Sequence, residues 1–172
     1  MADLPIENKV AKSGLQVIEM DQFVPEKGLI TIDLKDQLWQ GLALREKDFR
    51  TFVKEHDWSR YSDSAVAVFC SADAIIPHWA YMLVATNLKA HTDEVYFANP
   101  EEAEEIRVKS AIDSFDLSAF EDAKVIVKGC GEGNLSYRAY GHIANRLAPM
   151  VSSLMFGEPC STVPVYKRPR KK

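Results

Sequence analysis

The sequence is poor in the features that usually announce a site or a cellular destination. It has 3 cysteines among 172 residues, and none of them belongs to a CxxC pair. No apolar run approaches the ~18 residues of a membrane span, and the amino terminus lacks the basic start and apolar core of a secretory signal. No internal repeat or low-complexity stretch is evident. These absences predict a cytoplasmic protein without disulfide staples, since an odd number of cysteines cannot pair completely.

The composition is that of an ordinary globular domain. Hydrophobic residues make up 47% of the chain and charged residues 27%. A chain of this length can form one core that buries roughly 70% of the surface exposed on unfolding. We therefore predict a single domain over residues 1–172, with flexible tails at 1–12 and 167–172. The net charge of −4 argues against general nucleic-acid binding, although the basic tail offers a contact for RNA, phospholipid or an acidic partner.

The amino-terminal third has the pattern of strands followed by one helix. Residues 29–34 alternate apolar and polar side chains, as in a strand with one wet face, and residues 15–20 do so less regularly. Residues 38–44 are a third candidate strand. From 45 to 56 the apolar residues recur at helical spacing. We expect antiparallel strands and a helix in this region.

From residue 65 the pattern changes to alternating strands and helices. Strands are predicted at 65–70, 95–98, 124–128 and 151–156, and helices at 76–88, from 99 through 115, and at 136–148. Asn99 and Pro100 give the second of these helices a strong start, with acidic residues in its first turn. Such alternation favours parallel strands joined by right-handed crossovers. The predicted fold is thus α/β, with a mainly parallel sheet flanked by helices after an amino-terminal antiparallel strand region.

Each cysteine follows a predicted strand within about four residues. Because the carboxyl ends of parallel strands share one edge of a sheet, Cys70, Cys130 and Cys160 are expected to lie together there. The helices that follow point their amino termini at this edge, which favours thiolates. Three thiolates can hold zinc or, with a further ligand, an iron-sulfur cluster. His78 is the preferred further ligand because imidazole suits a thiolate set; other candidates are Asp73, Glu132 and Glu158.

Two other interpretations of the cysteines stay open. Cys130 lies between two glycines, whose backbone N–H groups can face an anion, so it is the best candidate for a nucleophile in acyl or sulfur transfer. The sequence assigns no histidine as its base. Alternatively, the three cysteines are separate buried hydrophobic residues. A separate alternative is a non-catalytic interaction module whose aromatic surfaces or basic tail engage a partner.

Motifs spread over nearly the whole chain resemble domain-of-unknown-function family 2480. They are Trp39-Gln40-Gly41-Leu42, Arg45 to Arg50, His56-Asp57-Trp58, Cys70 to Ile75, Trp79 to Leu83, Lys128-Gly129-Cys130 and Gly157 to Pro164. The family is uncharacterised, so the resemblance implies relatives and no reaction. It also implies an association with sulfur-mobilisation genes, and hence a partner in iron-sulfur cluster assembly. The leading hypothesis is a cytoplasmic accessory protein that binds a metal or cluster through the cysteines.

Overall fold

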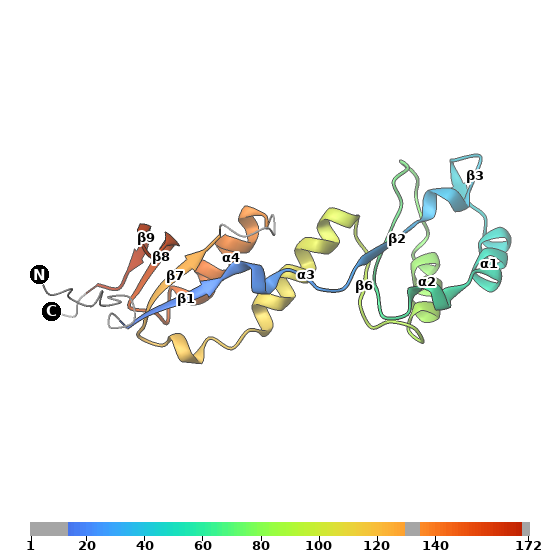
Figure 1. Ribbon diagram of the computed structural model, residues 1–172. Helices are drawn as coiled ribbons and strands as arrows, with labels where there is room; N and C mark the ends of the chain where they lie inside the picture. The colour runs from blue at the N-terminus through green and yellow to red at the C-terminus, as the bar shows by residue number, and fades with distance from the viewer. Residues whose placement is uncertain (1–13, 130–134, 170–172) are drawn as a thin grey trace, which may run out of the picture. The chain divides into compact units, whose positions relative to one another are not determined.

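The computed structural model describes residues 14–129 and 135–169, and the contacts divide the chain into two compact units (Figure 1). Unit 1 comprises Met1–Val24 and Val108–Lys172, and unit 2 comprises Pro25–Arg107. Each unit has its own hydrophobic core and its own mainly parallel sheet. The predicted α/β class is therefore confirmed, whereas the single domain over residues 1–172 stays a prediction.

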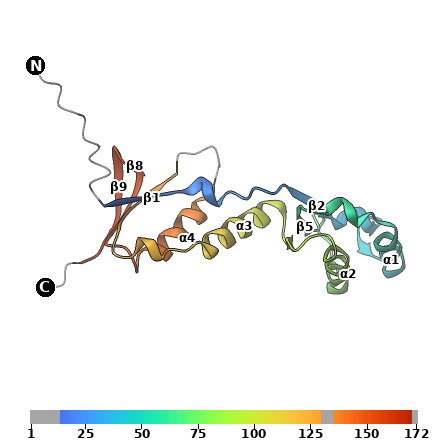
Figure 2. The same ribbon diagram turned by 60° about the horizontal axis from the view of Figure 1, so that its bottom comes forward.

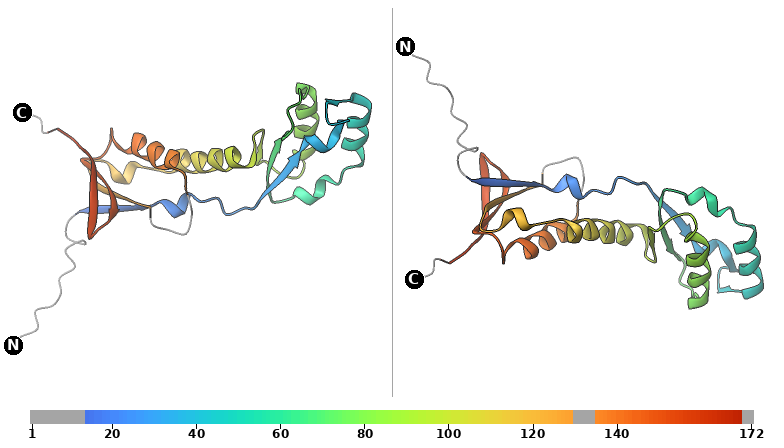
Figure 3. Two further views of the ribbon diagram at one scale, coloured as in Figure 1. Left: turned by 90° about the horizontal axis from the view of Figure 1, so that it is seen from above. Right: turned by 90° about the horizontal axis from the view of Figure 1, so that it is seen from below.

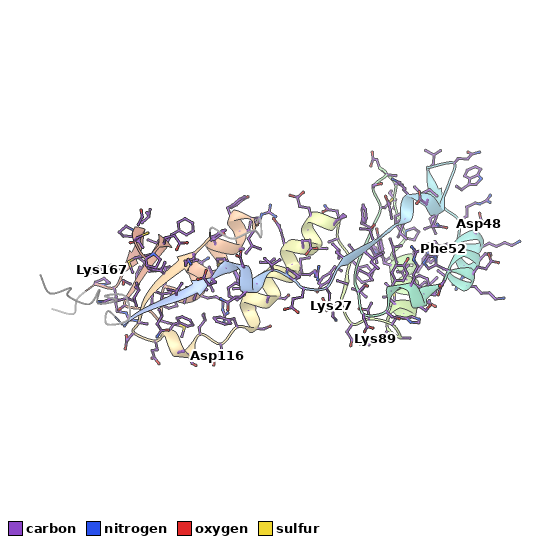
Figure 4. The ribbon with its side chains drawn as sticks, viewed as in Figure 1. Lys27, Asp48, Phe52, Lys89, Asp116 and Lys167 are labelled. Carbon is purple, nitrogen blue, oxygen red and sulfur yellow. The ribbon has the colours of Figure 1, made fainter. Side chains whose placement is uncertain are left out.

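Unit 2 contains a parallel sheet with the strand order β2-β5-β6. Its elements are β2 (Leu29–Asp33), η2 (Leu34–Gln37), β3 (Leu38–Trp39), β4 (Ala43–Leu44), α1 (Glu46–Glu55), η3 (Trp58–Tyr61), β5 (Ala65–Phe69), α2 (His78–Leu88) and β6 (Val95–Tyr96). The central strand β5 is buried at its first four positions, as its continuously apolar sequence predicts. The core packs α1 and α2 on this sheet through Phe49, Val84 and Leu88. Phe52, labelled in Figure 4, packs against this core from α1.

Unit 1 contains a sheet with the order β1-β7-β8-β9, in which the last pairing is antiparallel. Its elements are β1 (Leu15–Glu19), η1 (Met20–Phe23), the second part of α3 (Pro100–Ser114), η4 (Ser118–Phe120), β7 (Lys124–Lys128), α4 (Tyr137–Leu147), β8 (Ser153–Glu158) and β9 (Ser161–Lys167). Helix α4 and the second part of α3 lie on the same side of β1 in Figures 2 and 3. They bury Ile112, Ile143 and Leu147 in the core of the unit.

The antiparallel pairing expected near the amino terminus is the short hairpin of β3 and β4. Gln40, Gly41 and Leu42 connect these strands. Gln40 and Gly41 have φ angles of 51° and 71°, the two positive angles of a type I′ turn, and the Leu42 N–H donates to the Trp39 carbonyl at 3.1 Å. Strands β1 and β2 instead join the two parallel sheets, beside β7 and β5 respectively. Strand β9 was not predicted from the sequence; it turns back from β8 after Pro159 and Cys160.

The two units are structural repeats of each other, which corrects the expectation that the chain has no internal repeat. Each unit begins with a lead strand, β1 in unit 1 and β2 in unit 2, which runs into a 3-10 turn. The order helix, 3-10 turn, strand, helix, strand follows in both units, as α3-η4-β7-α4-β8 in unit 1 and α1-η3-β5-α2-β6 in unit 2. From the first helix onward, equivalent residues differ by a constant offset of 59 positions, as from Ala65 at the start of β5 to Lys124 at the start of β7. The loops from these strands to α2 and α4 have the same length.

Strand register and helix packing follow the same offset. Val66 pairs with Val95 in unit 2, and their equivalents Val125 and Leu154 pair in unit 1. Helices α2 and α4 bury the same three positions, which are Ala80, Val84 and Leu88 in one unit and Ala139, Ile143 and Leu147 in the other. Equivalent positions therefore build the two cores.

A polar turn before the equivalent strands β5 and β7, the middle strands of the repeat, is also repeated. Asp57 accepts hydrogen bonds from the backbone N–H and the hydroxyl of Ser59 at 3.0 and 2.5 Å. Asp116, labelled in Figure 4, accepts the same two bonds from Ser118 at 2.8 and 3.0 Å. Each turn is followed by an aspartate with positive φ, Asp63 (59°) and Asp122 (56°). The repeat thus extends to backbone conformations that few residue types adopt readily.

The basic carboxyl-terminal segment begins inside the fold of unit 1. Lys167 is the last residue of β9, and the backbone N–H of Arg168 donates to the carbonyl of Ser152 at 2.9 Å. The Arg168 guanidinium donates to the carbonyl of Met150 and pairs with Asp122. Unit 1 therefore holds the segment at its start. Within residues 14–129 and 135–169, no helix is long and apolar enough to cross a membrane.

Candidate functional site

A pocket of about 490 Å³ opens beyond the carboxyl ends of β5 and β6 in unit 2. It is lined by Val68, Phe69, Cys70, His78, Tyr81, Phe97, Ala98, Asn99 and Glu102. These residues come from the ends of the two strands, the first turn of α2 and the start of α3. Ligands of α/β proteins usually bind at this edge of a parallel sheet, so the pocket lies where a site is expected.

Cys70 directly follows β5 and is half-buried in the wall of the pocket. It is a free cysteine, and its Sγ donates to the carbonyl of Ala72 at 3.6 Å. The same carbonyl accepts the backbone N–H of Ala74 at 2.9 Å. The loop after β5 therefore turns beside the thiol and fixes its direction. This arrangement presents an unmodified thiol to the pocket.

Asp33, at the end of β2, anchors the loop next to Cys70. Its carboxylate accepts the backbone N–H and the hydroxyl of Ser71 at 3.0 and 2.6 Å. It also accepts the backbone N–H of Lys35 at 3.0 Å and lies 3.3 Å from the Lys35 ammonium. Burial raises the pKa of Asp33, but the hydrogen bonds from Ser71 and Lys35 outweigh burial and lower this pKa to about 2. Asp33 is therefore an ionised anchor at neutral pH.

Tyr81 and Phe97 form an aromatic wall of the pocket. Their ring centroids lie 5.8 Å apart and their planes meet at 87°, an edge-to-face contact. Phe97 is nevertheless 51% exposed, so one apolar ring of this wall faces solvent. Burial raises the pKa of Tyr81, and the Coulomb interaction with nearby Cys70 raises it further. The Tyr81 hydroxyl is therefore protonated at neutral pH and lies within electrostatic range of the Cys70 thiol.

Asn99 and Glu102 provide a polar end of the pocket at the start of α3. The Asn99 side-chain oxygen accepts the backbone N–H of Glu102 at 3.0 Å, and the Glu102 carboxylate accepts the backbone N–H of Asn99 at 3.4 Å. This reciprocal pair is a capping box, so the predicted N-cap is confirmed. Glu102 brings a carboxylate to the pocket, whereas the lining residues given above include no lysine or arginine.

The structure brings together two of the four predicted metal ligands, since Cys70 and His78 line the same pocket. Cys160 lies in unit 1, exposed in the turn between β8 and β9. Cys130 lies outside the described residues. In the part of the chain that the structure describes, no group of three or more His, Cys, Asp or Glu side chains is arranged to hold a metal ion. The four-ligand metal site and the nucleophilic role of Cys130 stay predictions.

The expectation that one sheet edge carries all three cysteines is wrong, because the preceding strands belong to two sheets. Strand β5, before Cys70, pairs with β2 and β6, whereas β8, before Cys160, pairs with β7 and β9. Strands β6 and β7 follow each other in the chain without being neighbours in a sheet. Alternating strands and helices indicate parallel strands but do not say which strands pair.

Site roles for Asp33, Tyr81 and Phe97 were not predicted from the sequence, and Asn99 and Glu102 were predicted only as the start of a helix. An aspartate in an alternating strand has no distinguishing mark in a single sequence. The two aromatic residues do leave a signal, because Tyr140 and Phe156 stand at the equivalent positions of unit 1. Aligning the two halves of the chain would have singled them out.

The described residues of unit 1 are arranged differently in the equivalent region. The rings of Tyr140 and Phe156 lie 5.7 Å apart at 90°, nearly the geometry of Tyr81 and Phe97. The residue after the middle strand is Gly129, and the Tyr140 hydroxyl donates to its carbonyl at 3.2 Å. In unit 1 the tyrosine hydroxyl thus reaches the backbone at the position where unit 2 has a cysteine.

The fold and the pocket define an α/β protein built from two repeated parallel-sheet units, with a pocket at the sheet edge of unit 2. Residues 5–168 match the family described as "Protein of unknown function (DUF2480)", and the chain belongs to this family. The resemblance inferred from the motifs is therefore confirmed. Neither a search of curated proteins nor a search of solved structures found a match.

Proposed function

We propose that this protein binds a small organic molecule in the pocket of unit 2, with the Cys70 thiol in contact with the ligand. The observation that carries the proposal is the convergence of a thiol, an imidazole, a phenol and a carboxylate on one hollow, from Cys70, His78, Tyr81 and Glu102. The lining combines apolar and polar side chains, and placed polar groups orient the ligand in binding pockets. A ligand would also cover the ring of Phe97, which otherwise faces water.

The chemistry of the lining favours a ligand with a flat apolar part and a positive charge. The rings of Tyr81 and Phe97 offer aromatic surface, which attracts both flat molecules and cations. Glu102 would attract a cation and repel an anion. Aromatic amines therefore match the pocket better than phosphates or carboxylates of similar shape.

Saturation-transfer NMR with tyramine tests this function, with 3-(4-hydroxyphenyl)propionate as the anionic probe of similar shape. We expect tyramine to bind several-fold more tightly than the propionate. Phe97→Ala should remove most of the tyramine signal, whereas the matched variant Phe156→Ala, at the equivalent position of unit 1, should leave it unchanged. Equal binding of the two probes, or equal effects of the two variants, would contradict the proposal.

A second candidate function is binding of a soft metal ion such as zinc, or of an iron-sulfur cluster. It is favoured by the presence of Cys70 and His78 in one pocket. These two donors do not complete a four-ligand zinc site. Cys130 and Cys160 are the other ligands predicted from the sequence, but the shared sheet edge that motivated them is not found among the described strands. The iron-sulfur assembly partner implied by the family resemblance belongs to this candidate.

Metal analysis and an absorption spectrum of protein purified without oxygen test the second candidate. Cys70→Ser and His78→Ala should each lower the metal content, and His91→Ala is a control outside the pocket lining. Colourless, metal-free protein that also fails to take up added zinc would contradict it.

A further inference from the structure

The two units place the same pair of aromatic residues beside two different strand ends. Tyr81 stands on α2 and Tyr140 on α4 at equivalent positions, each in edge-to-face contact with a phenylalanine. The residue that follows the middle strand is Cys70 in unit 2 and Gly129 in unit 1. The chain therefore contains a natural comparison of one tyrosine beside a cysteine and beside a glycine.

The glycine in unit 1 is what allows its tyrosine to approach the backbone. A Cβ atom built on Gly129 would lie 2.6 Å from the Tyr140 hydroxyl and 2.8 Å from the nearest ring carbon. Both separations are well below van der Waals contact, so any side chain at position 129 must displace the ring. The hydrogen bond from Tyr140 to the Gly129 carbonyl thus depends on the absence of a side chain.

We infer that Cys70 determines the shape of the binding pocket in unit 2 by holding Tyr81 away from the backbone carbonyl at position 70. In unit 1 a Cβ atom at the equivalent position would lie 2.6 Å from the tyrosine hydroxyl, so a residue with a side chain, such as Cys70, does not allow Tyr81 the same approach. The pocket is lined by Tyr81 and by Phe69 and Cys70 at the end of β5, so the position of Tyr81 sets the space between them. Cys70 therefore acts as a specificity-determining residue through its bulk, separately from any contact that its thiol makes with a ligand.

This inference rests on the proposed function only where it concerns ligands. The position of Tyr81 depends on the side chain at residue 70 whether or not a molecule binds. The size of the side chain is the relevant property, so alanine should replace cysteine in this role and glycine should not. Serine tests the thiol, because it keeps the bulk while removing the sulfur.

Crystal structures of Cys70→Gly and Cys70→Ala test the inference directly. In Cys70→Gly we expect the Tyr81 hydroxyl to donate to the carbonyl of residue 70, as Tyr140 does to Gly129 at 3.2 Å, with loss of pocket volume. In Cys70→Ala we expect Tyr81 to stay in place. A Tyr81 ring that does not move in Cys70→Gly, or that moves equally in Cys70→Ala, would overturn the inference.

The reverse substitution gives a second test that does not depend on the stability of the glycine variant. Gly129→Ala should push the Tyr140 hydroxyl out of hydrogen-bonding distance of the carbonyl at residue 129. Retention of that hydrogen bond would overturn the inference. The matched control is Gly141→Ala in α4, because a Cβ atom at Gly141 meets open space. This control should leave Tyr140 in place.

Tyramine binding separates failure of this inference from failure of the proposed function. If wild-type protein does not bind tyramine but Tyr81 moves in Cys70→Gly, the proposed function fails and the inference stands. If wild-type protein binds tyramine and Cys70→Gly binds equally well with Tyr81 unmoved, the function stands and the inference fails. If both hold, Cys70→Gly should weaken binding by about tenfold or more, because a blocked pocket loses most contacts with the ring, while Cys70→Ala changes it little.

Discussion

The two units share a fold plan and differ at the carboxyl edge of the sheet. In unit 2, Asp33 ends the lead strand and anchors Ser71, beside a half-buried thiol and a pocket. In unit 1 the equivalent residue is Glu19, which pairs with Lys128 at 2.9 Å. Equivalent core positions hold the same architecture in both units, so a few residues at the strand ends account for the difference in chemistry. The repeated fold leaves these edges free to diverge.

The sheet edge of unit 1 is occupied by ion pairs. Lys128 lies 2.9 Å from Glu19 and 3.3 Å from Glu158, which come from the strands on either side. Hydrogen bonds to Glu19 and Glu158 raise the pKa of Lys128. An ammonium held between two carboxylates is protonated at neutral pH, so Lys128 is suited to joining strands rather than to nucleophilic chemistry.

Truncating the equivalent core leucines should have the largest effects on stability. Leu88→Ala and Leu147→Ala each remove a fully buried side chain and should each cost about 2–5 kcal/mol of unfolding free energy. Trp39, Trp58 and Trp79 all belong to unit 2, so urea denaturation followed by tryptophan fluorescence reports on that unit. Circular dichroism reports on both.

Because each unit has its own core, Leu88→Ala should lower the fluorescence midpoint. Leu147→Ala should instead lower the circular-dichroism transition while leaving the fluorescence midpoint nearly unchanged. If both variants shift the fluorescence midpoint equally, the two cores unfold together, and the two units are not independent.

Removing the acid at the end of each lead strand should have a smaller and unequal effect. Asp33→Ala breaks three hydrogen bonds to a carboxylate and should cost about 1–3 kcal/mol. Glu19→Ala breaks one pair with a partly exposed lysine, and because water screens such pairs it should cost clearly less than Asp33→Ala. Urea denaturation of the two variants measures the difference, and a larger loss for Glu19→Ala would contradict the contrast between the sheet edges.

The same acid makes the stability of unit 2 depend on pH. Folding lowers the pKa of Asp33 from 3.8 to about 2, so its stabilising contribution is full above about pH 4 and is lost as the pH falls towards 2. Asp33→Asn cannot titrate and should lack this contribution. Tryptophan fluorescence should give a higher urea midpoint for wild type than for Asp33→Asn at pH 5. This difference between the two midpoints should shrink as the pH is lowered to 2. A difference that stays constant would contradict the assignment.

The repeated aspartate turns should give the smallest effects, and these should be equal. Asp57→Ala and Asp116→Ala each remove an acceptor of two hydrogen bonds at the start of a 3-10 turn. Because both turns lose the same cap, each variant should lower its urea midpoint slightly, by less than Asp33→Ala does. Fluorescence measures the first loss and circular dichroism the second. A clear loss of stability in one variant and none in the other would show that the two turns contribute differently to stability despite their equal geometry.

Most of the elements were predictable from the sequence because periodicity reflects burial. The run from Ala65 to Phe69 is apolar throughout and forms a central strand, and Ile143 and Leu147 share the buried face of α4. The pairing of strands was not predictable, since β1 and β7 lie far apart in the chain and pair only through the tertiary fold. Hydrophobic periodicity indicates that a segment is a strand but does not indicate which distant strand it pairs with.

The site was predictable only in part. Cys70 and His78 were singled out because a thiol and an imidazole have few roles, and both line the pocket. The contribution of Phe97 depends on its edge-to-face contact with Tyr81 and on its exposure. Neither property can be predicted from the residues that surround Phe97 in the sequence. The division into two sheets was equally hidden and removed the basis for placing Cys70 and Cys160 at one edge.

The central claim is that the sheet edge of unit 2 carries a ligand pocket, and a titration of isotope-labelled protein with tyramine tests it most directly. Ala98 lines the pocket, and Gly157 stands at the equivalent position of unit 1. In an amide correlation spectrum, the Ala98 signal should shift progressively with tyramine while the Gly157 signal stays in place. Shifts of equal size at both residues, or at neither, would contradict the account.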